Sequence, residues 1–364
     1  MLCSLVKRCL VAPFLGFVAP FSPRLKLSLR PSICFWWMGC CNENNHKSIH
    51  SHGGENVTKR VLAIDGGGIR GIIPATVLSH IEAAMGRSAC ELFDLMVGTS
   101  TGGILALGLS RPDSEAPARF TAQQAAELYE HHGAHIFEYS LWRKFRTAGG
   151  ILEEAYSHAN LEKILEDYFS EARLGDCRIP TMVTSYDIQA RKTVFLKSWQ
   201  TEHHDILCKD AARATSAAPT YFEPKPLDVE EQERILIDGG IFINSPSVSA
   251  YAEAIKLFPD EEIKVLSLGT GELTRSIPYH EAKTWGSALW VISLLDCMFD
   301  GIAKAADYQM RLFLGERYQR LQIPLYYASD DMDDASQGNI RNLKQTAKEL
   351  IDTQQSTIAN FFAD

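Results

Sequence analysis

A strand, a tight turn and a helix follow one another without a break in residues 93–109. FDLMV is a short apolar run typical of a buried strand, and GGILALGL is typical of a buried helix. Only the turn from Gly98 to Gly102 separates them, so the chain must pass sharply from strand to helix. A strand that leads directly into a helix is the repeating unit of a mostly parallel α/β sheet.

The rest of the chain repeats this alternation. Together the segments predict a three-layer α/β sandwich, with a mostly parallel central sheet of about six strands and helices on both faces. We expect one catalytic domain over residues 58–364. The expected strands are 59–65, 93–99, 181–188, 192–199, 234–240 and 262–271, and the expected helices are 71–86, 101–109, 121–132, 158–169, 209–217, 247–257, 284–319 and 338–361.

Residues 1–57 differ from this pattern and are expected to form a leader and linker, disordered or used for targeting. The first 41 residues hold five Lys or Arg and no Asp or Glu. A signal peptide, an organellar transit peptide and an unstructured or misassigned leader are all compatible with this composition. If translation began at Met38, the string MGCC would resemble a lipid-anchored N-terminus, although Glu43 departs from that motif.

Charge and cysteine usage limit the compartment and the partners. The net charge of -9 argues against a nucleic-acid partner. The four cysteines beyond the leader show no metal-ligand spacing, so we expect free thiols in a reducing compartment. They are Cys90, Cys177, Cys208 and Cys297. We also expect neither a metal nor a cofactor.

The turn at residues 98–102 has the G-x-S-x-G pattern of a nucleophile elbow. A serine at the tip of such a turn takes a strained backbone conformation, and side chains at Gly98 and Gly102 would collide with neighbouring segments. The Ser100 hydroxyl would then lie near a helix N-terminus, where developing negative charge is stabilised. The pattern therefore predicts that Ser100 is a nucleophile.

A second glycine loop, DGGGIRG at residues 65–71, precedes the elbow. It reads as G-x-G-x-x-G, so a dinucleotide-binding enzyme is an alternative function. That alternative is disfavoured because no acidic residue ends the next strand. Beside a serine nucleophile, the amides of Gly66, Gly67 and Gly68 could bind an oxyanion instead. Arg70 would add positive charge near this oxyanion hole or orient the loop.

Serine needs a base, and the sequence offers two arrangements. Asp238 ends an apolar strand and is followed by Gly239 and Gly240, so it can act alone as a base with a raised pKa. A Ser100–Asp238–His280 triad has the right chain order, but His280 lies in a polar loop. Asp238 alone is the better candidate.

Three motifs in this order, DGGGIRG, GTSTGG and DGG, resemble the patatin-like phospholipase family over roughly residues 58–355. The resemblance implies a lipid acyl hydrolase with a Ser100–Asp238 dyad and an oxyanion loop that includes Gly66, Gly67, Gly68 and Arg70. It also implies an α/β fold related to cytosolic phospholipase A2, and ester hydrolysis without a metal. A catalytically silent lipid-binding module is a further alternative.

A lipid or lysolipid substrate requires contact with a membrane, so we expect a cytoplasmic protein with peripheral membrane association. Two segments are candidates for this contact. Residues 137–150 interleave aromatic and basic side chains, and residues 285–299 are apolar nearly all round. Either segment can also be explained by packing in the core. The sequence specifies no oligomeric state.

Overall fold

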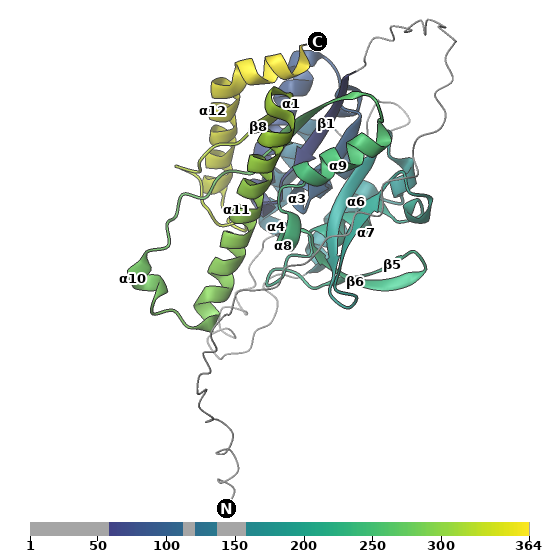
Figure 1. Ribbon diagram of the computed structural model, residues 1–364. Coiled ribbons are helices and arrows are strands. Elements are labelled where there is room, and N and C mark those ends of the chain that lie inside the picture. Colours follow the sequence, from purple (N-terminus) through teal and green to yellow (C-terminus); the bar gives the residue numbers. More distant parts are fainter. Residues whose placement is uncertain (1–57, 112–120, 137–157, 364) are drawn as a thin grey trace, which may run out of the picture. The chain divides into compact units, whose positions relative to one another are not determined.

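The central sheet runs through the middle of the domain, with helices on either side (Figure 1). The computed structural model describes residues 58–111, 121–136 and 158–363. In these ranges the sheet has eight strands. Seven follow the order β5-β6-β3-β2-β1-β7-β8, and the eighth, β4, pairs with β3. The strands are β1 (Thr58–Ile64), β2 (Leu95–Thr99), β3 (Thr181–Asp187), β4 (Lys192–Lys197), β5 (Lys225–Val229), β6 (Gln232–Asp238), β7 (Glu262–Leu268) and β8 (Tyr318–Leu321).

Alternating side chains of β1 build a separate core on each face of the sheet. Leu62 and Ile64 belong to one buried cluster, whereas Val61 and Ala63 belong to the other. The first cluster packs against α1 (Ile72–Met85), α3 (Thr101–Ser110), α4 (Ala122–Ile136), α6 (His158–Phe169), α7 (Cys208–Thr215) and α12 (Gln337–Phe362). The second packs against α9 (Ser247–Leu257) and α11 (Ser287–Leu314). Helices therefore cover both faces, which confirms the predicted three-layer α/β fold.

The strand registers bring the ends of β2 and β6 together. β4 pairs with Met182–Asp187 along one edge of β3. The other edge is shared, because β2 reaches Thr184 in parallel and β6 reaches Ser185 from the opposite direction. The carboxyl ends of β2 and β6 therefore meet head to head at neighbouring positions of β3.

The six predicted strands are all present, and the central pairings β1–β2, β1–β7 and β2–β3 are parallel, as expected. Two short outer strands, β5 and β8, were not predicted. The predicted helix 284–319 was wrong at its end, because α11 stops at Leu314 and the chain enters β8 at Tyr318. Gly315 ends the helix with a φ of 54°, which L side chains rarely adopt.

Several sequence expectations lie outside the described residues. Residues 1–57 and the candidate membrane segment 137–150 are among them. The described chain from residue 58 onward belongs to the unit Glu55–Asp364. Across its described ranges, no helix combines the length and apolar character that a bilayer crossing requires.

Candidate active site

Ser100 stands at the tip of the turn between β2 and α3. Its backbone has a φ of 54° and a ψ of -125°, a strained conformation for a residue with a side chain. The two flanking glycines leave no space for side chains. A Cβ on Gly98 would lie 2.1 Å from the Gly102 carbonyl oxygen, and a Cβ on Gly102 would lie 2.3 Å from the Ile64 oxygen. These close approaches explain why the motif requires glycine at both positions.

Two threonines hold the turn in place. The Ser100 amide donates to Thr215 Oγ1 at 3.0 Å, and the Thr215 hydroxyl donates to the Thr184 carbonyl at 2.6 Å. The Thr99 and Thr184 hydroxyl oxygens lie 2.8 Å apart. Sequence reasoning did not assign a role to Thr184 or Thr215, because each contact joins residues more than 30 positions apart.

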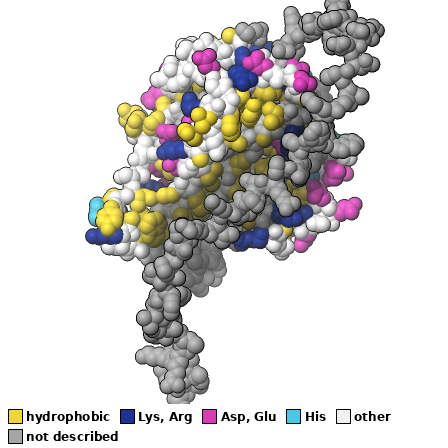
Figure 2. Space-filling model, viewed as in Figure 1, with side chains coloured by type: hydrophobic (Ala, Val, Ile, Leu, Met, Phe, Trp, Pro, Cys, Tyr) yellow, Lys and Arg dark blue, Asp and Glu magenta, His cyan; other side chains and the backbone are white. Residues whose placement is uncertain are grey.

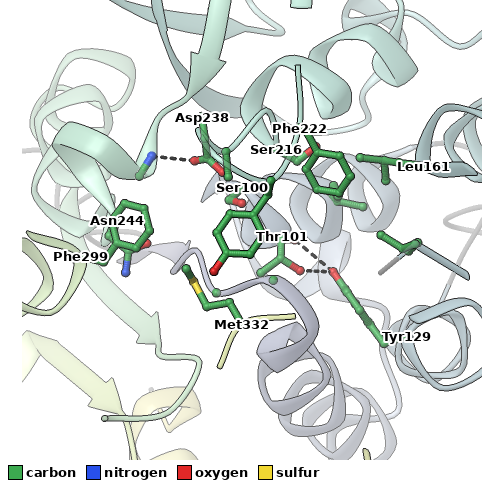
Figure 3. A pocket seen from close by; sticks show the side chains of 17 residues that line it. Ser100, Thr101, Tyr129, Leu161, Ser216, Phe222, Asp238, Asn244, Phe299 and Met332 are labelled. Atoms are coloured by element: carbon green, nitrogen blue, oxygen red, sulfur yellow. Dashed lines mark hydrogen bonds between the residues drawn. The ribbon is translucent and has the colours of Figure 1, made fainter. Parts of the chain in front are cut away.

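Asp238, the last residue of β6, is buried beside Ser100 (Figure 3). Burial raises the pKa of Asp238 to about 7, although hydrogen bonds from Ser100 and the Gly240 amide oppose the shift. The Gly240 N–H donates to Asp238 Oδ1 at 2.7 Å. Among the described residues, no Lys or Arg influences this carboxyl group. Asp238 is therefore a buried carboxylate that can take up a proton near neutral pH.

The turn after Asp238 also depends on glycine. A Cβ on Gly239 would lie 2.1 Å from Thr184 Oγ1, so a side chain there would collide with the threonine that supports the elbow. Gly240 begins the short helix α8 (Gly240–Ile243), and its N–H is the one that reaches Asp238. The Gly240 amide therefore positions the carboxylate.

The three glycines of the first loop have different hydrogen-bonding states. The Gly66 amide already donates to the Asn244 carbonyl at 3.0 Å. The Gly67 and Gly68 amides have no acceptor in the described part of the chain, and both residues line the pocket that contains Ser100. Gly68 has a φ of 58°, and a Cβ there would lie 2.2 Å from the Met332 oxygen. These two amides are free to bind an oxyanion.

Arg70 lies outside the Ser100 pocket and hydrogen-bonds to the backbone of the glycine loop. Its Nε donates to the Gly67 carbonyl at 3.3 Å, and its Nη1 donates to the Asp330 carbonyl at 3.3 Å. Burial lowers the pKa of the Arg70 guanidinium, while Asp296 and Asp330 oppose that shift. The side chain lines a separate polar cleft and is placed to orient the loop.

The residue before the triple glycine is anchored by a remote arginine. Arg320 in β8 donates to both carboxylate oxygens of Asp65, at 3.0 and 2.6 Å. Both side chains are almost fully buried. Arg320 also donates to the Ser267 hydroxyl at 2.7 Å. This pair fixes the start of the glycine loop, and no local sequence pattern marked Arg320.

The pocket around these groups has mostly apolar walls (Figure 3). Ser100, Asp238, Gly67 and Gly68 share it with side chains from five other segments. A pocket of this character suits an apolar ligand with one polar reacting group. Side chains in its wall that sequence reasoning did not assign include Ile104, Tyr129, Leu161, Phe222, Asn244, Phe299 and Met332.

His280 does not enter this arrangement. It lies on α10 (Tyr279–Ala282) with 76% of its side chain exposed, and its Nε2 lies 3.8 Å from Glu281 Oε1. No histidine lines the Ser100 pocket in the described chain. Within residues 58–111, 121–136 and 158–363, no group of three His, Cys, Asp or Glu side chains is arranged to hold a metal ion.

Comparison with known proteins gives consistent matches along the chain. The family model of the patatin-like phospholipases matches residues 62–251, more than half of the 364 residues. Patatin-17 of Solanum cardiophyllum is 31% identical over 339 residues, covering 82% of this chain and 84% of that protein. Patatin-like protein 2 of Oryza sativa subsp. indica is 27% identical over 343 residues, covering 82% and 85%.

Two solved structures also align with the chain. Human GIVD cytosolic phospholipase A2 aligns with a TM-score of 0.43 at 11% identity, over 84% of this chain and 60% of that one. VipD from Legionella pneumophila aligns with a TM-score of 0.38 at 13% identity, over 81% and 67%.

Proposed function

Because the chain belongs to the patatin-like phospholipase family, we propose that it is a lipid acyl hydrolase. It would cleave fatty acyl esters of glycerolipids through an acyl-enzyme on Ser100. The reaction would be of the phospholipase A or lysophospholipase type. One observation carries the proposal. A strained serine, a buried carboxylate with a pKa near 7 and two unpaired amides line the same apolar pocket.

Asp238 is the general base in this proposal. Its carboxylate accepts the Ser100 hydroxyl proton as Ser100 Oγ attacks the ester carbonyl carbon. When the tetrahedral intermediate collapses, the bond to the leaving alcohol breaks and Asp238 returns the proton to that alcohol. A base works best when its pKa lies near the working pH, and burial places Asp238 in that range.

The amides of Gly67 and Gly68 stabilise the oxyanion in both half-reactions. Both line the pocket, and neither is used by another acceptor in the described chain. Arg70 acts as a positioning residue, because it binds the Gly67 carbonyl and so fixes that peptide. In the second half-reaction Asp238 takes a proton from water as the water oxygen attacks the acyl carbon. When the bond between Ser100 Oγ and the acyl carbon breaks, Asp238 returns that proton to Ser100 Oγ and the fatty acid is released.

The exposed face of α11, formed by Trp290, Leu294, Tyr308 and Leu312, is the proposed membrane contact. Trp290 and Tyr308 are separated by five helical turns, as are Leu294 and Leu312, so the four lie on one side. They are 41 to 66% exposed. Hydrophobic side chains gather on the side of the molecule along which α11 runs (Figure 2). Such a face suits the boundary between headgroups and acyl chains.

Liposome co-sedimentation tests this contact. A Tyr308→Asp, Leu312→Asp variant should bind neutral phosphatidylcholine vesicles at least about tenfold more weakly, because each apolar side chain contributes roughly 1.5–3 kcal/mol when buried. Tyr326→Asp, at a tyrosine that is 75% exposed, is the control. Equal binding by both variants would remove α11 from the proposed membrane surface.

The serine chemistry is tested with a fluorophosphonate probe and a mixed glycerolipid substrate. We expect wild-type protein to be labelled on Ser100 and to release free fatty acid, and Ser100→Ala to do neither. Circular dichroism should show that the variant is folded. Labelling at another residue, or fatty-acid release by Ser100→Ala, would refute the proposed function.

A further inference from the structure

A second cavity adjoins the catalytic pocket between α3, α4 and α6. It is a small space with an almost wholly apolar lining, and we call it the inner apolar pocket. Four side chains, Ile104, Tyr129, Ile136 and Leu161, line both cavities. The two spaces are therefore neighbours that meet at these four side chains.

The inner apolar pocket has the chemical character of hydrocarbon. Its deeper wall comes from Leu105, Leu128, Ile164 and Leu165, together with aromatic residues of α6. The Tyr129 hydroxyl, at the junction, is hydrogen-bonded to Thr101. An apolar ligand in this space would make dispersion contacts with these walls.

Gly108 lies on α3 beyond Ser100 and Ile104 and lines the inner apolar pocket. Ile104 and Gly108 follow Ser100 at intervals of four residues, so the three positions lie along one side of the helix. Gly108 is about 12 Å from Ser100 along the helix axis. Gly108 lines the inner apolar pocket but not the catalytic one.

Neither backbone geometry nor close packing requires glycine at position 108. A Cβ there would meet nothing within 4 Å, whereas Cβ atoms on Gly102 and Gly103 of the same helix would collide with neighbours. Glycine within a helix is less favourable than alanine. What the missing side chain provides at position 108 is space.

We propose that the inner apolar pocket receives the distal part of the substrate's acyl chain and that Gly108 sets the chain length it accepts. The inference rests on the proposed Ser100 chemistry, because the acyl carbonyl must lie at Ser100 for the chain to follow α3. A larger side chain at position 108 would occupy part of the inner apolar pocket, so long chains would lose more affinity for the transition state than short ones.

The test compares kcat/KM for p-nitrophenyl palmitate and p-nitrophenyl butyrate in the full chain. For Gly108→Leu we expect the palmitate-to-butyrate ratio to fall by about tenfold or more, the size of effect that one misfitting group has in an apolar pocket. Gly108→Ala should shift the ratio in the same direction by less, and it keeps the test decisive if leucine prevents folding. Gly338→Leu is the matched control, since a Cβ on this helical glycine also meets nothing.

Fluorophosphonate labelling of Ser100 separates the two proposals. If Ser100 is labelled in wild type and in the Gly108 variants but the palmitate-to-butyrate ratio does not change, the chain-length inference is wrong and the serine mechanism stands. If wild type is not labelled at Ser100, the proposed function itself fails. A ratio that falls equally in Gly338→Leu would also overturn the role of Gly108.

Discussion

Two Asp-Gly-Gly turns, at residues 65–67 and 238–240, place similar sequences in different electrostatic surroundings. Both aspartates follow apolar strand residues, and their exposed fractions are 1 and 2%. Asp65 receives two hydrogen bonds from the Arg320 guanidinium. The Asp238 carboxylate accepts hydrogen bonds from the Gly240 amide and the Ser100 hydroxyl, and no Lys or Arg of the described chain influences it.

The difference shows that the partner of a buried carboxylate decides its role. A bidentate arginine compensates the buried charge of Asp65 and fixes it as an anchor for the glycine loop. Asp238 lacks such compensation, so burial raises its pKa to about 7 and makes proton uptake easy. An aspartate that is buried beside a serine and has no cationic partner is therefore the better candidate for a base.

The largest expected effect is on catalysis. Asp238→Asn should lower kcat/KM by about 10⁴-fold, similar to the loss when a serine hydrolase base is disabled. Asp65→Asn, assayed per folded molecule, should lower it by at most about a hundredfold, because it disturbs only the support of the oxyanion loop. Hydrolysis of a soluble ester by both variants is the measurement. Equal losses would mean that the two aspartates do not have separate roles.

Stability should change in opposite directions at pH 8. Asp65→Asn leaves the Arg320 charge buried without its partner, and we expect it to lower the free energy of unfolding by about 3–5 kcal/mol. Asp238→Asn removes a buried, uncompensated carboxylate and should leave the free energy of unfolding unchanged or higher. Urea unfolding curves compare the variants, and a large loss in Asp238→Asn would contradict this difference.

The pH dependence of stability is the smaller and more specific effect. The folded-state pKa of Asp238, about 7, lies above the ordinary value of 3.8, so the native state holds the proton more tightly. The Asp238 contribution to wild-type stability should therefore fall between pH 4 and 7, by up to about 4 kcal/mol, and stay constant above that. The difference between wild type and Asp238→Asn should grow over the same window. A constant difference from pH 4 to 8 would show that this pKa is not raised.

The long, locally patterned elements could be predicted from the sequence. Six strands and the helices between them have apolar runs or helical spacing of their own. The strands β5 and β8 lack this signal, because one contains Pro226 and the other has only four residues after a long helix. β5 forms by pairing with β6 across the two-residue turn at Glu230 and Glu231, whereas β8 forms by pairing with β7, which is remote in the sequence.

The same limit applies to the candidate site. Ser100, Asp238 and the glycine loop could be proposed from motifs, because close backbone approach requires glycine and those glycines are visible in the sequence. The hydrogen-bond partners that give these residues their different surroundings could not be identified from local sequence patterns. Arg320 lies 255 positions from Asp65, and Thr215 lies 115 positions from Ser100. The use of the Gly66 amide by Asn244 likewise depends on the folded chain.

The pH dependence of fluorophosphonate labelling tests most directly whether Asp238 alone activates Ser100. In wild type the second-order labelling rate should rise about tenfold per pH unit below an inflection near pH 7 and level off above it, because only the Asp238 carboxylate can accept the proton. Asp238→Asn should label far more slowly and without this inflection. The same inflection in Asp238→Asn, or its loss in His280→Ala, would contradict the account.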